Sequence, residues 1–87
     1  MTRNVTVGID IGTQNTKVMV VEHGRDKTQT SSRIIGTGLV PTKGLKKGFV
    51  ADSKELIKTI EQVVHEAEVS SGIKIRQATI SVGGGTA

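Results

Sequence analysis

The fold is decided by residues 5–22, which read VTVGIDIGTQNTKVMVVE. In residues 5–11 apolar side chains alternate with small or polar ones, and a period of two predicts a β-strand. Residues 17–22 predict a second strand, and their continuous apolar stretch indicates burial on both faces. Because only the turn-type residues 12–15 separate the two segments, we expect them to pair as an antiparallel hairpin.

The next segments predict one more strand between two loops. Residues 23–32 are polar and without periodicity, so they predict a loop. Residues 33–40 predict a third strand that is interrupted by Gly36 and Gly38, and residues 41–48 predict a second loop.

Residues 53–71 predict the one helix of the chain. Asp52 is a suitable N-cap, Glu55 completes a capping box with it, and Gly72 is a suitable C-terminal stop. The apolar positions recur at helical spacing and define the buried face: Leu56, Ile57, Ile60, Val63, Val64 and Ala67.

A fourth strand is predicted within residues 73–82, with Ala78, Ile80 and Val82 on one face. The predicted class is therefore α/β, a β-β-β-α-β unit whose mixed sheet has one crossover helix and whose last strand runs parallel to the first. One helix covers one face only. We therefore expect a partial domain of a larger protein, or alternatively a small domain that dimerises through its uncovered face.

The amino-acid composition of the chain limits the kinds of molecule that it is expected to bind. The net charge is +4 and the chain has one aromatic residue, Phe49, so a base-stacking surface is excluded and no nucleic-acid partner is expected. The densest basic cluster, Lys43, Lys46 and Lys47, predicts a solvated loop. The chain has no cysteine and no apolar run near the length of a membrane span, and these features predict a cytoplasmic protein.

The linker of the first hairpin carries the strongest functional signal. Successive N–H groups in such a turn can hold phosphate oxygens, and Gly12 lacks the Cβ that would block their approach. The Thr13 hydroxyl adds a hydrogen bond and Lys17 a positive charge. Asp10 would repel phosphate unless a cation lay between them, so it predicts Mg²⁺ held through water.

Simpler explanations exist for these and other residues. Residues 10–13 also fit a plain turn in which Asp10 accepts backbone hydrogen bonds and Gly12 takes a positive φ. His23 and His65 have no convergent partners in the sequence and predict surface positions. The glycines at 83–85 predict a domain-boundary hinge, with a second phosphate loop as the alternative.

Residues 8–17 resemble the first phosphate-binding motif of the actin-like ATPase superfamily, which includes actin, heat-shock chaperone ATPases, sugar kinases and the bacterial cell-division family FtsA. In order along the chain, residues 35–38, 44–52, 55–68, 72–75 and 80–84 resemble FtsA. The resemblance implies an actin-like (ribonuclease H-like) fold. Residues 1–87 would be the N-terminal part of its nucleotide-binding subdomain, with the phosphate hairpin at 8–17 and the crossover helix at about 53–71.

This resemblance implies a protein that binds ATP and Mg²⁺, polymerises, and tethers the FtsZ ring to the cytoplasmic face of the cell membrane at the division site. It implies no catalytic residue here and at most weak ATPase activity in the full-length protein. The FtsZ-contacting region and the membrane-binding C-terminal helix would lie outside these residues. The implied site residues are Asp10 for water-held Mg²⁺ and Gly12, Thr13, Gln14, Asn15 and Lys17 for phosphate.

Three alternatives remain at the level of sequence. The first is an actin-fold phosphotransferase related to sugar kinases, although the chain lacks the tryptophan expected before the helix in those enzymes. The second is a type IV pilus assembly relative of FtsA. The third is a nucleotide-free interaction module that docks through its uncovered sheet face.

Overall fold

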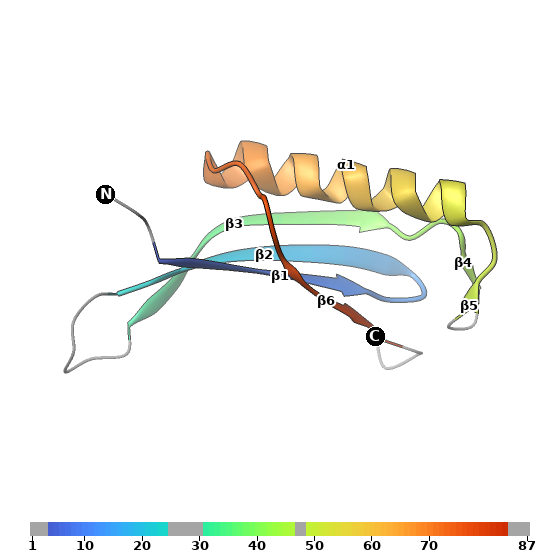
Figure 1. Ribbon diagram of the computed structural model, residues 1–87, viewed down its shortest axis with the longest axis horizontal. Helices are drawn as coiled ribbons and strands as arrows, with labels where there is room; N and C mark the ends of the chain where they lie inside the picture. Colours follow the sequence, from blue (N-terminus) through green and yellow to red (C-terminus); the bar gives the residue numbers. More distant parts are fainter. Residues whose placement is uncertain (1–3, 25–30, 47–48, 84–87) are drawn as a thin grey trace.

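The computed structural model describes residues 4–24, 31–46 and 49–83 (Figure 1). Its elements are, in chain order, β1 (Val5–Ile11), β2 (Asn15–His23), β3 (Ser32–Pro41), β4 (Leu45–Lys46), β5 (Phe49–Val50), α1 (Ser53–Ser71) and β6 (Thr79–Val82). The main sheet has the strand order β3-β2-β1-β6, and β4 pairs with β5 in a separate hairpin. The predicted β-β-β-α-β order is thus confirmed, with a small additional hairpin before the helix.

The main sheet is mixed. β1 pairs with β2 antiparallel, which confirms the first hairpin, and β2 pairs with β3 in the same sense. β6 pairs with β1 in parallel, with Ile9 opposite Ile80 and Ile11 opposite Val82. The chain therefore has the predicted α/β class and is consistent with a partial actin-like unit.

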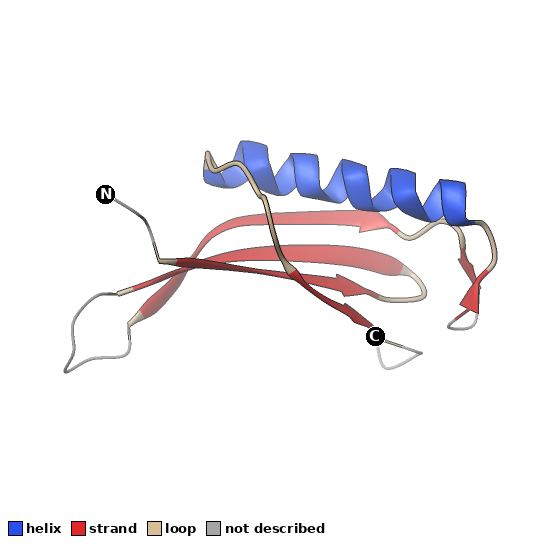
Figure 2. Cartoon of the chain, in the orientation of Figure 1, coloured by secondary structure: helices blue, strands red, loops and turns tan. Residues whose placement is uncertain are grey.

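One face of this sheet carries the helix and the other does not (Figures 1 and 2). α1 lies on β3 and β2. On each strand, alternate residues point toward α1, so the strand residues of the buried core lie on one face of the sheet. The apolar members of the core are Ile9, Ile11, Val18, Val20, Val40, Val63 and Ala67.

The predicted burial of the second strand on both faces is only partly observed. Val18 and Val20, on the helix side of β2, are completely buried, whereas Met19 and Val21, on the other face, are half-buried. The reason is that, within the described residues, α1 covers a single face of the sheet. On β6, Ile80 and Val82 share one face as predicted, but they stay exposed because the helix lies over the far strands.

The prediction that glycines interrupt the third strand is wrong. β3 runs through Gly36 and Gly38 without a break, and both glycines are buried under α1. A Cβ added at Gly38 would lie 2.5 Å from the carbonyl oxygen of Val63, so the missing side chain lets helix and strand approach closely. The one irregularity of the strand is a bulge at residue 35, because Val20 pairs with Gly36 and Val21 with residue 34.

The helix begins and ends where its capping residues predict. Asp52 Oδ1 accepts from the N–H groups of Lys54 at 3.1 Å and Glu55 at 3.2 Å. Gly72 has a φ of 74°, in the left-handed region that glycine favours, and its N–H donates to the Glu68 carbonyl at 2.8 Å. The reciprocal half of the capping box is not made, because the Asp52 N–H donates instead to the carbonyl of Gly44 at 3.0 Å.

The predicted buried face of the helix needs one correction. Ile57 is 56% exposed, and the buried residue of the first turns is instead Thr59. Its hydroxyl oxygen accepts from the N–H of Lys43 at 3.1 Å and lies 3.1 Å from the Glu55 carbonyl. A polar residue is tolerated in this buried place because its hydrogen bonds are satisfied by the segment before β4 and by the preceding turn of α1.

The ends of both predicted loops belong to strands, and residues 25–30 of the first loop lie outside the described residues. His23 and Ser32 belong to β2 and β3, and Pro41 is the last residue of β3. The second loop also contains β4, which begins directly after Gly44 (φ 86°) and pairs antiparallel with β5. Lys43 and Lys46 are exposed, as predicted for a solvated cluster, whereas Lys47 lies outside the described residues.

The close approach at Gly38 generates a stability prediction. Gly38→Ala should destabilise the chain by about 1–3 kcal/mol, because the added methyl group must displace the backbone of α1. Gly8→Ala is the matched control, since a Cβ at this strand glycine meets no atom within 4 Å. Urea denaturation followed by circular dichroism measures both variants. Equal midpoints would show that helix and strand can separate without cost.

The N-cap generates a second prediction. Asp52→Ala should lower the free energy of unfolding by about 1 kcal/mol, because the N–H groups of Lys54 and Glu55 lose their acceptor. Asp52→Asn retains a side-chain oxygen at the same place and should keep most of the stability. The same denaturation measurement applies, and an alanine variant as stable as the asparagine variant would contradict the capping role.

Candidate functional site

Two charged residues of the predicted site face each other across the first hairpin. Asp10 on β1 is the direct register partner of Lys17 on β2. Both side chains are exposed on the sheet face opposite α1, because their strand neighbours Ile9, Ile11 and Val18 occupy the helix side. The alternation that builds the core therefore also places these opposite charges together on the uncovered face.

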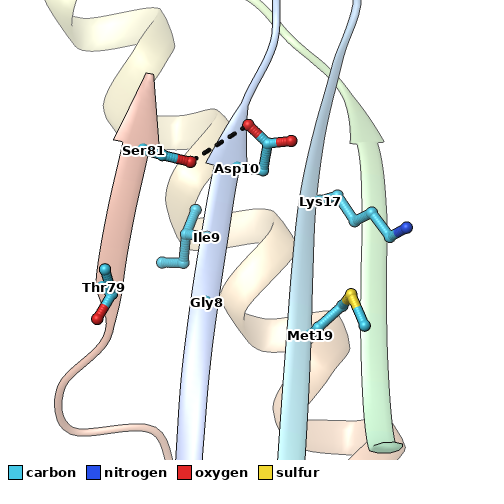
Figure 3. A pocket seen from close by; sticks show the side chains of 7 residues that line it. All are labelled: Gly8, Ile9, Asp10, Lys17, Met19, Thr79 and Ser81. Atoms are coloured by element: carbon cyan, nitrogen blue, oxygen red, sulfur yellow. Dashed lines mark hydrogen bonds between the residues drawn. The ribbon is translucent and has the colours of Figure 1, made fainter. Parts of the chain in front are cut away.

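Asp10 and Lys17 make no ion pair with each other, although they are opposite in register. Figure 3 shows the Asp10 carboxylate turned toward Ser81 of β6, while the Lys17 side chain extends the other way, toward β3. The carboxylate and the ammonium group are thus separate charges on one surface. A ligand that carries both a cation and an anion could contact each of them.

The turn between the strands contributes backbone groups. The buried Gly12 uses its N–H within the turn, donating to the carbonyl of Asn15 at 2.9 Å. The carbonyl of Gln14 accepts from the N–H of Thr42 at 2.9 Å, which ties the turn to the end of β3. In residues 4–24, 31–46 and 49–83, the N–H groups of Thr13 and Gln14 find no backbone acceptor. These two amides, and not that of Gly12, remain for an anion.

The plain-turn explanation for residues 10–13 required two features that the described part of the chain does not show. Positive φ values occur at Gly44 and Gly72, and Gly12 is not among these glycines. The Asp10 carboxylate accepts from the Ser81 hydroxyl and, within the described ranges, from no backbone N–H. The hydrogen bonds that hold this turn come from its backbone and from Thr42, so Asp10 is not needed to form it.

A pocket of about 290 Å³ lies beside these charges on the uncovered face (Figure 3). Gly8, which has no side chain, and Met19 contribute to its lining, and Asp10, Lys17, Thr79 and Ser81 provide its polar groups. Thr79 and Ser81 were not among the site residues predicted from the sequence. Their alternation with Ile80 and Val82 placed them on one face of the last strand, but only the parallel register shows that Thr79 lies opposite Gly8 and Ser81 opposite Asp10.

The donor set fits a hydrated magnesium ion with phosphate. The described residues contain no group of three or more histidine, cysteine or acidic side chains that could enclose a metal. A single exposed carboxylate suits Mg²⁺, which keeps several waters and is commonly held by one or two carboxylates together with phosphate oxygens. Lys17 and the free amides of the turn are the groups that would meet the phosphates.

The remaining candidates from the sequence lie elsewhere. His23 is the last residue of β2, and its Nε2 lies 2.8 Å from the Thr6 hydroxyl and its Nδ1 3.0 Å from the Ser32 hydroxyl. His65 is exposed on α1. The N–H of Gly83 donates to the carbonyl of Ile11 at 3.0 Å and so extends the parallel ladder, while the two glycines that follow lie outside the described residues.

In the described part of the chain, no helix has the length and apolar character needed to cross a membrane.

Comparison with known proteins found no matching family model. Curated relatives do match. The chain is 44% identical over 78 residues to the cell division protein FtsA of Bacillus subtilis, a match that covers 90% of this chain and 17% of that protein. It is 34% identical over 76 residues to FtsA of Enterococcus faecalis, covering 87% of this chain and 16% of that protein.

A more distant match is FtsA of Escherichia coli K12, which is 28% identical over 82 residues, or 94% of this chain and 19% of that protein. The FtsA resemblance predicted from the motifs is therefore confirmed across most of the chain. The chain spans less than one fifth of the length of these relatives, in keeping with a segment of a longer protein.

Proposed function

We propose, on the premise that this chain is a segment of an FtsA-type cell division protein, that its first hairpin binds the phosphates of ATP together with Mg²⁺. The observation that carries the proposal is the register pair of Asp10 and Lys17 on the uncovered face, beside a turn with two free amides. Opposite charges at adjacent strand positions match a ligand made of a cation and a polyanion.

Each residue has a distinct role in this proposal. The Asp10 carboxylate holds a water of the hydrated magnesium ion, and Lys17 places its charge against a phosphate oxygen. Thr13 donates through its hydroxyl and its N–H, and Gln14 through its N–H, to the same polyanion. Gly12 keeps the approach clear of a Cβ. Asn15 begins β2, and its exposed side chain supplies a further polar contact.

For the whole protein, we extend the proposal to a cytoplasmic, polymer-forming adaptor that connects the FtsZ ring to the membrane at the division site. The surfaces for FtsZ, for self-association and for membrane attachment belong to parts of the protein outside these residues. Nucleotide acts as a switch in this scheme, and turnover is slow at most. Asp10 and Lys17 are therefore binding residues, and no catalytic residue is assigned.

The charge pair generates a prediction for the full-length protein. Asp10→Ala and Lys17→Ala should each weaken binding of Mg-ATP by about ten- to hundredfold, because each loses a charge-assisted contact with the ligand. Glu61→Ala and Lys58→Ala are matched controls, since both residues are exposed on α1. Isothermal titration calorimetry measures all four variants. Unchanged affinity in both hairpin variants would remove the phosphate-site proposal.

A second prediction concerns the 87 residues alone. We expect them to bind ATP with a dissociation constant no better than about 1 mM, because one hairpin leaves the base and sugar of the ligand in water, whereas functional pockets bury most of it. A titration followed by NMR should shift the amide signals of Thr13 and Gln14 at high ATP concentration only. Micromolar binding by this segment would show that the hairpin needs no second domain.

A further inference from the structure

The strand β6 brings one hydroxyl group to the carboxylate of the proposed magnesium site. Ser81 is the parallel register partner of Asp10, so the two residues lie side by side on the same sheet face. The Ser81 hydroxyl donates to Asp10 Oδ1 across 3.4 Å, and Figure 3 shows the two side chains turned toward each other. This is a long hydrogen bond, and it joins segments 71 positions apart in sequence.

Among the described residues, the other groups near Asp10 do not offer the same contact. Lys17, on the opposite neighbouring strand, extends toward β3. Thr79 is on the same strand and face as Ser81, but its register partner is Gly8, which has no side chain. Within the described ranges, Ser81 is therefore the residue whose side chain donates a hydrogen bond to this carboxylate.

The orientation matters because the χ2 torsion of aspartate has broad, shallow minima. A carboxylate without a partner samples many orientations, and a hydrogen bond to one oxygen restricts them. With Oδ1 held by Ser81, Oδ2 is left to accept from a water of the metal. Hydrogen bonds to metal-binding groups act in this way in metal sites generally, where they orient the ligands and increase affinity.

We propose that Ser81 is a positioning residue for Mg²⁺: its hydroxyl fixes the Asp10 carboxylate so that the second oxygen faces the hydrated ion. This inference rests on the proposed function of the hairpin and adds a third strand to its site. It assigns Ser81 no contact with the nucleotide. Loss of the hydroxyl therefore raises the Mg²⁺ concentration that is needed to increase ATP affinity and leaves the affinity for metal-free ATP unchanged.

The test compares Ser81→Thr with Ser81→Val in the full-length protein. The two variants have nearly the same shape and both are β-branched, so both suit a strand, but only threonine retains the hydroxyl. ATP affinity is measured by calorimetry over a series of Mg²⁺ concentrations and in EDTA. The Mg²⁺ concentration that gives half of the full gain in ATP affinity should be about three- to tenfold higher for the valine variant than for the wild type. For the threonine variant it should equal that of the wild type.

Two further variants separate the possible outcomes. Asp10→Asn removes the proposed metal contact, and in this background Ser81→Val should have no additional effect on the Mg²⁺ series. Thr37→Ala, which removes an exposed hydroxyl on β3 that does not line the pocket, controls for general effects on the sheet. Thermal unfolding of each variant checks that the fold is retained, and Ser81→Ala replaces the valine variant if the latter is destabilised.

The results distinguish the positioning role of Ser81 from the phosphate-binding role of the hairpin. If Asp10→Asn weakens the Mg²⁺ response but Ser81→Val and Ser81→Thr behave alike, the positioning role is overturned and the phosphate hairpin stands. If Asp10→Asn has no effect on the Mg²⁺ response, the assignment of Asp10 to the metal fails, and the role of Ser81 fails with it. A loss confined to the valine variant, which disappears in the Asp10→Asn background, supports the inference.

Discussion

The structure depends on burial of a single sheet face beneath one helix. Val18 and Val20 of β2 and Ile9 and Ile11 of β1 point toward α1, and with a period of two their strand neighbours must point away from it. Asp10 and Lys17 are among these neighbours, so the same constraint that buries the core exposes the charged pair. A one-residue slip of the hairpin register would bury the charges and expose the valines, which makes the site inseparable from the packing.

The helix packs close to the sheet because two residues of β3 beneath it are glycines. Gly36 and Gly38 carry no side chain where α1 passes over β3, and both are buried. Polar contacts add to this packing along the outer edge of the sheet, where the N–H groups of Thr37 and Leu39 donate to the side chains of Ser70 and Glu66. The helix therefore covers the edge strand β3 and its neighbour β2 on one face of the sheet, whereas the site on β1, β2 and β6 lies on the other face.

The candidate site combines groups from three strands and a turn. Strand pairing fixes the groups on the strands, and backbone hydrogen bonds hold the turn. The pairing of β1 with β2 fixes Asp10 against Lys17, and the backbone bonds of Gly12 and Gln14 hold the turn between them. The parallel pairing of β6 then adds Ser81 to Asp10 from a distant part of the chain. A polyanion with its cation suits this arrangement because the carboxylate and the ammonium group remain separate rather than neutralising each other.

The sequence alone was enough to predict the local features: the alternation of β1, the hairpin, the caps Asp52 and Gly72 at the helix ends, and the charged residues Asp10 and Lys17 within the hairpin. These depend on neighbours within a few positions, which is why pattern reasoning predicted them. Close packing of the helix and the pairing of β6 depend on contacts between distant segments, and they are evident only in the tertiary structure. Gly36 and Gly38 were predicted to interrupt a strand, but the structure shows that they allow α1 to pack closely on β3. Ile57 was predicted to be buried, but Thr59 is the buried residue there. The proximity of Ser81 to Asp10 is evident only from the pairing of β6 with β1. The physical reason is that close packing and strand register join segments far apart in the chain, and no local pattern records which segments will meet.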